Sequence, residues 1–237
     1  MTPNWVQIYE AARRANLAYE MDPVKSQQAF EATGLYWLGL YSDNNNQAVA
    51  CIDNHGDGYL SISGTRFSQG KIWDLIDDSW LIPTSLGGGV YVTSGALEGV
   101  QEMWDWAKSL VPPSTLWHVE GHSLGGWRTR YTPLFVLPTE IGRLHSFESP
   151  KGANKAYWKR YKQQLIGLVS VVNERDLFVD WPFGLLNEWE HPMLPILWLR
   201  KDGTFSEIYP GQWPGGRSIS DHSMDLVEAR CKKLAGL

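Results

Sequence analysis

The sequence has few cysteines and no long apolar run. Its 237 residues include two cysteines, Cys51 and Cys231, which are too few for the disulfide framework of a small secreted domain. We expect both to be free thiols, with a single bridge between them as the alternative. No stretch of about 18 apolar residues is present, so we predict no transmembrane segment.

The N-terminus and the charge exclude further classes of protein. The first residues, MTPNWVQIYEAARRA, lack the apolar core of a secretory signal, which favours a protein that is cytoplasmic or released without a classical signal peptide. The net charge of −5 argues against nucleic-acid binding. Basic residues gather only in one run, which is either a solvated helix face or a surface that attracts anions. The run comprises Lys151, Lys155, Lys159, Arg160 and Lys162.

Tryptophan is abundant, with 13 residues. Because a buried indole needs a partner for its N–H group, some of them should be partly exposed. We interpret most as large core residues. Those between Trp181 and Trp198 are candidates for a wall that contacts an acyl chain or a sugar.

Apolar periodicity predicts an alternation of helices and strands. Strands alternate with helices through the middle of the chain and no linker divides it, so we expect one α/β domain over residues 1–237 with a mostly parallel sheet. The expected helices lie near residues 2–19, 23–32, 72–78, 95–110, 153–164 and 220–235. The expected strands lie near 47–53, 59–63, 115–120, 143–147, 167–173, 196–200 and 204–209.

The strongest motif is Gly121-His122-Ser123-Leu124-Gly125, which fits the G-x-S-x-G nucleophile elbow. A sharp strand-to-helix turn needs small residues on both sides of the serine, since a larger Cβ substituent would clash. A predicted strand precedes the motif, as the elbow requires. The sequence therefore predicts an α/β-hydrolase fold, with a mostly parallel central sheet and helices on both faces, and Ser123 as the nucleophile.

A serine nucleophile needs a base, and histidine is the usual one. In α/β-hydrolases the order along the chain is serine, acid, histidine, so the base should come from a late segment. His222, expected at the start of the last helix, fits best, with His191 as the alternative. For the acid, Asp176 follows the predicted strand at 167–173, with Asp180 as the alternative.

The tetrahedral intermediate of acyl transfer needs donors for its oxyanion. One is expected to be the backbone N–H of Leu124, the residue after the nucleophile. The second is expected from Gly64-Thr65, where a strand ends, because Thr65 offers both an N–H and a hydroxyl donor.

Taken together in this order, four segments resemble the class 3 lipases, the fungal-type triacylglycerol lipase family. The resemblance implies catalytic Ser123, Asp176 and His222, with Thr65 and Leu124 as the oxyanion hole, and no metal or organic cofactor. The sequence departs from the family's usual small residues after the elbow, and it has Glu148 where the family usually has glycine. The segments are SISGT at 61–65, GHSLGG at 121–126, FESPKGAN at 147–154, and residues 173–182 with 221–223.

These residues favour a serine carboxylic-ester hydrolase, a lipase or esterase of lipid metabolism, acting on an acylglycerol or short-chain ester with transient contact to a lipid surface. Two alternatives stay open: an esterase for aryl or sugar esters of a polysaccharide, and a non-catalytic binding module on the hydrolase fold. A peptidase or thioesterase would use the same triad. The short segment between Thr65 and the helix expected at residue 72 leaves little room for a long apolar lid.

Overall fold

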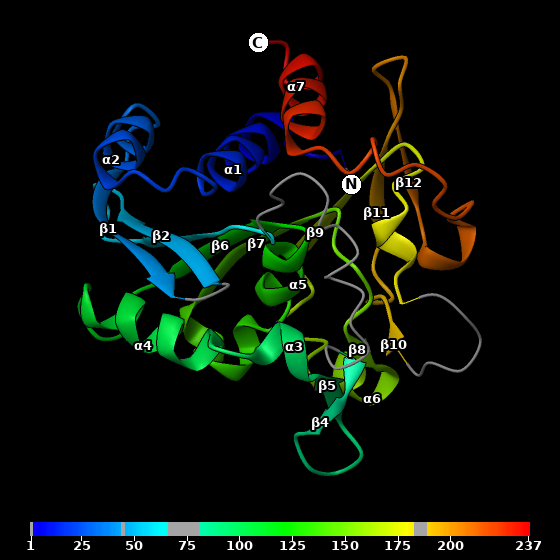
Figure 1. The fold of residues 1–237 in the computed structure, drawn as a ribbon, viewed down its shortest axis with the longest axis horizontal. Helices are drawn as coiled ribbons and strands as arrows, with labels where there is room; N and C mark the ends of the chain where they lie inside the picture. Colours follow the sequence, from blue (N-terminus) through cyan, green and yellow to red (C-terminus); the bar gives the residue numbers. More distant parts are fainter. Residues whose placement is uncertain (1, 44–45, 66–80, 183–188) are drawn as a thin grey trace.

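An eight-stranded sheet forms the centre of the fold (Figure 1). The computed structural model describes residues 2–43, 46–65, 81–182 and 189–237. The strands lie in the order β1-β2-β3-β6-β7-β9-β11-β12, with β3 to β11 mutually parallel and the outer strands antiparallel. Their bounds are β1 Tyr36–Asp43, β2 Asn46–Ile52, β3 Gly58–Ile62, β6 Trp117–His122, β7 Ile141–Phe147, β9 Leu168–Asn173, β11 Ile196–Leu199 and β12 Phe205–Ile208.

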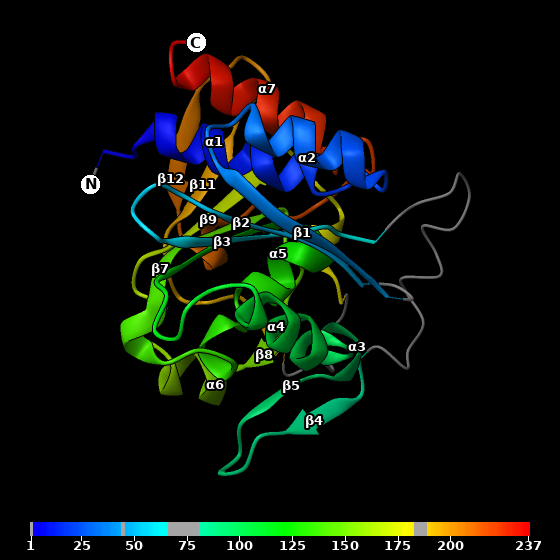
Figure 2. The ribbon, with the colours of Figure 1, turned by 90° about the vertical axis from the view of Figure 1, so that its left-hand side faces the viewer.

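Helices cover both faces of this sheet (Figures 1 and 2). On one face lie α1 (Trp5–Leu17), α2 (Pro23–Glu31) and α7 (Met224–Leu234). On the other lie α3 (Ser94–Leu97), α4 (Val100–Ser109), α5 (Leu124–Thr129) and α6 (Lys155–Arg160). The predicted class, a mostly parallel sheet between two helical layers, is confirmed.

The helical spacing of apolar residues explains which faces are buried. In α1, Ile8, Ala12 and Ala15 recur at intervals of three or four and pack with Val227 of α7 in the core below them. In α4, Met103, Trp104 and Ala107 also lie on one face of the helix, and they are buried in the core on the opposite side of the sheet. No helix among the described residues is long and apolar enough to cross a bilayer.

A second, antiparallel sheet was not predicted. It pairs β4 (Pro83–Ser85), β5 (Tyr91–Thr93), β8 (Ala153–Asn154) and β10 (Trp189–Glu190). Strands of two or three residues carry too little alternation to be recognised in a sequence. Short 3₁₀ turns complete the structure at Thr132–Leu134, Pro138–Glu140, Phe178–Asp180 and Pro210–Gln212.

Three predicted helices differ from the structure. The helix expected at 153–164 is shorter, because Ala153–Asn154 form β8 and α6 ends at Arg160. The helix expected at 95–110 divides into α3 and α4, because Glu98 is extended and Gly99 adopts a φ of 69°. The last helix begins at Met224, so His222 lies in the loop before it and not at its start. The helix expected at 72–78 lies outside the described residues. Cys51 and Cys231 are free and buried, as expected.

Candidate active site

The elbow motif forms the turn between β6 and α5. Ser123 stands there with φ 56° and ψ −121°, a strained conformation that occurs at functional sites. A Cβ placed on Gly121 would lie 2.3 Å from the Gly125 carbonyl carbon, and one on Gly125 would lie 2.1 Å from the Ile62 oxygen. Both glycines are therefore needed, because no larger residue fits where the helix crosses the ends of β3 and β6.

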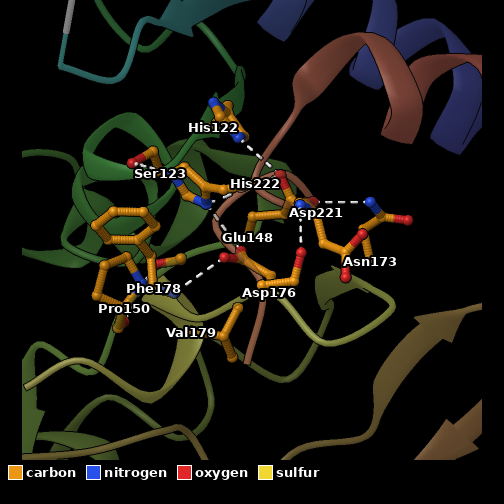
Figure 3. A network of polar contacts seen from close by, with 12 residues as sticks. His122, Ser123, Glu148, Pro150, Asn173, Asp176, Phe178, Val179, Asp221 and His222 are labelled. Atoms are coloured by element: carbon orange, nitrogen blue, oxygen red, sulfur yellow. Dashed lines mark hydrogen bonds and ion pairs between the residues drawn. The ribbon is translucent and has the colours of Figure 1, made fainter. Parts of the chain in front are cut away.

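His222 lies between Ser123 and Asp176 (Figure 3). Its Nε2 is 2.8 Å from the Ser123 hydroxyl oxygen, and its Nδ1 is 2.8 Å from Asp176 Oδ2. Ser123 is 2% exposed and Asp176 is fully buried. The structure thus brings together the three residues selected from the sequence, which lie far apart along the chain.

The loops that carry the acid and the histidine are held to one another. Asp176 follows β9 and pairs with Ser218, while the Leu177 N–H donates to the Ser218 carbonyl at 3.0 Å. Asn173, the last residue of β9, donates its side-chain amide to the Asp221 carbonyl at 2.7 Å. These bonds fix the backbone immediately before His222, so the imidazole is positioned by its own loop as well as by Asp176.

Burial raises the pKa of Asp176, and the adjacent His222 opposes that rise. The second carboxyl oxygen of Asp176 accepts the Phe178 backbone N–H at 2.9 Å, which also favours the carboxylate. The Phe178 ring packs against the imidazole with centroids 4.5 Å apart. Asp176 therefore has the contacts of an acid that orients a histidine.

The alternatives considered for base and acid have other partners. His191 Nε2 donates to the Val179 carbonyl at 2.8 Å, and its Nδ1 lies 3.2 Å from the Arg130 guanidinium. Burial lowers the pKa of His191 to about 3. Asp180 accepts the Gly216 backbone N–H. Both residues are engaged in holding loops together.

The two candidate oxyanion donors lie on either side of the elbow. Leu124 is the first residue of α5, so its N–H has no acceptor within the helix. Gly64, next to Thr65, approaches the nucleophile so closely that a Cβ placed on it would be 2.8 Å from the Ser123 Cβ. Within the described part of the chain, the buried Thr65 hydroxyl has no hydrogen-bond partner. Both groups therefore remain candidates to bind a substrate oxygen.

No protein-family model and no curated protein sequence matches this chain. Solved structures do. Lipase II of Rhizopus niveus is 16% identical, with a TM-score of 0.70 over 96% of each chain. The triacylglyceride lipase of Rhizomucor miehei is 18% identical, with a TM-score of 0.69 over 94% of each chain. A further triacylglycerol lipase, described as having a serine protease triad as its catalytic centre, is 18% identical with a TM-score of 0.67 over 92% of each chain.

The chain has the fold of the fungal triacylglycerol lipases. The class 3 lipase-like resemblance and the α/β-hydrolase fold read from the sequence are both confirmed at the level of fold. At these identities the likeness extends to the arrangement of the elements and not to the substrate.

The structure explains how this lipase fold accommodates bulky residues after the elbow. The Trp127 indole fills the space beside Gly152, where a Cβ would lie 1.2 Å from the indole nitrogen. Arg128 donates to the Ala96 carbonyl at 3.2 Å, and Arg130 donates to the Pro150 carbonyl at 3.0 Å. Burial lowers the pKa of Arg128 to about 10 and that of Arg130 to about 9. Both arginines therefore donate to backbone carbonyls and not to Ser123.

Two residues beside the triad were not selected from the sequence. Glu148 follows β7 and is fully buried, with Oε2 2.9 Å from His122 Nε2 and 3.9 Å from His222 Nδ1 (Figure 3). Tyr19 lies on the other side of His122, with its hydroxyl 2.7 Å from Nδ1. In the sequence, the feature that could have identified Glu148 is that it stands where the class 3 lipases usually have glycine.

His122, Glu148 and His222 offer ligand atoms within 4.8 Å of one another, a spacing found in metal sites. Hydrogen bonds already use these atoms. His122 is bonded at both ring nitrogens, and His222 Nδ1 faces Asp176. We therefore assign the cluster to the hydrogen-bond network of the triad.

The basic run found in the sequence contributes to a different feature of the lipase fold. Lys155, Lys159 and Lys162, here called the α6 lysines, line a cavity of about 260 Å³ together with apolar side chains. Its apolar lining includes Trp158 and Leu165. The cavity borders α6 and β10, and no triad residue lines it.

Proposed function

We propose that this chain is a serine carboxylic-ester hydrolase of the lipase or esterase type, with Ser123 as nucleophile, His222 as base and Asp176 as the orienting acid. One observation carries the proposal. A buried imidazole lies 2.8 Å from a serine hydroxyl on one side and 2.8 Å from a buried carboxylate on the other. A binding module has no need of this arrangement at a strained elbow, which supports catalysis over the non-catalytic alternative.

The contacts support a two-step acyl transfer. His222 Nε2 accepts the proton of the Ser123 hydroxyl while its oxygen attacks the ester carbonyl, and Asp176 holds the Nδ1–H tautomer. The oxyanion would accept hydrogen bonds from Leu124 N–H and from Thr65. His222 then passes the proton to the departing alcohol, leaving an acyl-enzyme on Ser123. Water, activated by the same histidine, releases the acid.

For the substrate we propose an acylglycerol or short-chain ester, with the fold likeness to triacylglycerol lipases as support. The aryl or sugar ester alternative was supported by the tryptophan content and by the short segment available for a lid. Trp181, Trp189 and Trp198 are instead 3%, 7% and 9% exposed, so they fill the interior. Transient contact with a lipid surface is also part of the proposal, with the α6 lysines as the candidate contact.

The test is covalent labelling of the intact protein, followed by mass mapping of the adduct. Because Ser123 is only 2% exposed, a compact probe such as diisopropyl fluorophosphate is used beside a long-chain fluorophosphonate. Ser123→Ala removes the proposed nucleophile. Ser220→Ala is the matched control, since Ser220 lies on the loop before His222 but bonds only to Ser218 among its described partners.

We expect one adduct, on Ser123, which is lost in Ser123→Ala and retained in Ser220→Ala. A series of nitrophenyl esters from acetate to palmitate then ranks acyl length. Failure of both probes to label a folded sample would contradict the hydrolase proposal and favour the binding module. If Ser123 is labelled but no carboxylic ester is hydrolysed, the proposed triad stands and the proposed ester substrate is rejected. Peptide and thioester substrates would then be tested.

A further inference from the structure

A second buried carboxyl group, Glu148, lies beside the proposed catalytic histidine. Its Oε2 is 3.9 Å from His222 Nδ1, the same nitrogen that contacts Asp176 at 2.8 Å. Glu148 is fully buried and stands at a φ of 50°, a backbone conformation that glycine adopts freely and other residues adopt at a cost. The lipase family pattern has glycine here, so this chain keeps a strained, buried glutamate at a position where a smaller residue suffices.

Hydrogen bonds hold the Glu148 carboxylate in place and set its direction. The Tyr19 hydroxyl, which lies against Gly64, is 2.7 Å from His122 Nδ1. Burial, and the neighbouring His222, lower the pKa of His122 well below its usual range, so this imidazole is neutral and has one N–H. When Glu148 is ionised, that N–H is at Nε2 and donates to Glu148 Oε2, while Nδ1 accepts the Tyr19 hydroxyl.

The other oxygen of Glu148 is unused. Among the residues that the structure describes, Oε1 has no hydrogen-bond partner although it is buried. A proton on Oε1 would have no acceptor, whereas a carboxylate can offer this oxygen to a nearby N–H. The group with such an N–H beside Glu148 is His222, whose ring also packs on His122 with centroids 4.7 Å apart.

The surrounding charges link Glu148 to Asp176. Burial raises the pKa of Glu148 well above its usual range, Asp176 and Asp221 raise it further, and Arg230 opposes them. Replacing Asp176 by a neutral residue removes one of these causes and so favours the Glu148 carboxylate. The titratable and charged groups that face Glu148 are Tyr19, His122, Asp176, Asp221, His222, Arg230 and Cys231.

We infer that Glu148 is a second acid of the catalytic histidine, a positioning residue that accepts the His222 Nδ1–H when Asp176 is absent or turned away. The inference rests on the proposed function, because it assigns Glu148 a role through His222. Glu148 touches neither substrate nor reacting atoms. Its carboxylate supports the imidazolium that forms during acyl transfer, and the Tyr19–His122 pair keeps it from turning away.

The experiment is a double-mutant cycle on kcat and KM for a short nitrophenyl ester, over a range of pH. Loss of the orienting acid costs about 10⁴-fold in kcat in a triad with one acid. We expect Asp176→Asn to lose only about 10²-fold here, and Glu148→Gln to lose less than about 10-fold. The double variant is expected to lose about 10⁴-fold. KM should change little, since neither carboxylate contacts substrate.

The pH profile separates an acid role from a structural one. The residual activity of Asp176→Asn should rise with pH as Glu148 ionises, and Glu148→Gln in the same background should abolish that rise. Asp176→Asn with Glu148→Asp should behave like the double variant, because the shorter side chain withdraws from His222. Asp225→Asn is the matched control in that background, because it removes an acidic side chain that accepts the Asn16 side-chain amide and is not one of the groups that face Glu148. It should keep the residual activity.

Two results would overturn the inference: a 10⁴-fold loss in Asp176→Asn alone, or residual activity that Glu148→Gln does not reduce. Circular dichroism melting establishes that each variant folds. If the Glu148 variants do not fold, Tyr19→Phe in the Asp176→Asn background replaces them, since it frees His122 and should lower the residual activity. A wild-type protein that hydrolyses no ester and takes no probe refutes the proposed function itself, so the two failures are distinguishable.

Discussion

The buried ion pair between α1 and β6 gives the sharpest prediction of stability. Arg14 Nε donates to Glu120 Oε1 at 2.8 Å, and the Ser61 hydroxyl donates to the same oxygen at 2.5 Å. Arg14 is 7% exposed and Glu120 fully buried. Glu120 stands three residues before Ser123, so the pair fastens the helical layer to the strand that carries the elbow.

Arg14→Met leaves the Glu120 carboxylate buried without its counter-charge. Removing one partner of a buried pair costs about 3–5 kcal/mol, whereas exposed pairs contribute about 0–1 kcal/mol. For a chain of this size that loss lowers Tm by roughly 6–20 °C. The Ser61 hydroxyl would compensate only in part, because it supplies a single neutral donor.

The assay is urea unfolding followed by tryptophan fluorescence, with calorimetry for Tm. Arg13→Met is the matched control, since Arg13 is the neighbouring arginine and, within the described part of the chain, makes only a long, exposed hydrogen bond to the Ala32 carbonyl at 3.5 Å. It should change the free energy of unfolding by less than about 0.5 kcal/mol. Arg14→Met with Glu120→Gln should be more stable than Arg14→Met alone. A cost below about 1 kcal/mol for Arg14→Met would refute the reasoning.

Three further predictions concern the oxyanion hole, the core and the α6 lysines. Thr65→Val should lower kcat on esters by about 10²–10³-fold at unchanged Tm, with Thr65→Ser retaining most of the activity. Gly152→Ala should lower the free energy of unfolding by more than about 3 kcal/mol, because the new Cβ would lie 1.2 Å from the Trp127 indole. Adding Trp127→Leu to this variant should restore part of the lost stability. Replacing all three α6 lysines by glutamine should weaken sedimentation with anionic phosphatidylglycerol vesicles at low salt and leave hydrolysis of a soluble ester unchanged. Equal binding by the glutamine variant, or by neutral phosphatidylcholine vesicles, would reject the lysine contact.

The elbow and the candidates for base and acid could be selected from the sequence because each has a local signature. Glycines flank Ser123 at fixed positions, Asp176 follows an apolar strand, and His222 comes late in the chain. The structure brings these three together without any change of candidate. The single domain over residues 1–237 stays a prediction, for which one cooperative unfolding transition is the expected result.

Other features depend on contacts that the sequence does not express. The strand β1, at the edge of the large sheet, carries half-exposed side chains and no clean alternation. The break at Glu98-Gly99 lies inside a continuous apolar period, and only the packed structure shows that Gly99 adopts a left-handed backbone. Arg128 and Arg130 look like surface residues in the sequence, yet both are buried, where backbone carbonyls accept their N–H groups.

Glu148 shows most clearly why the site cannot be read entirely from motifs. A lone glutamate matches no sequence motif. Its role comes from a hydrogen-bond chain that starts at Tyr19, whose hydroxyl lies against Gly64, passes through His122, and ends beside His222. Gly64 also precedes the candidate oxyanion donor Thr65. One end of the chain therefore lies beside the candidate oxyanion donor and the other beside His222. A change at Tyr19 should thus alter both the orientation of His222 and the backbone at Gly64, which separates this network from a carboxylate that merely balances charge.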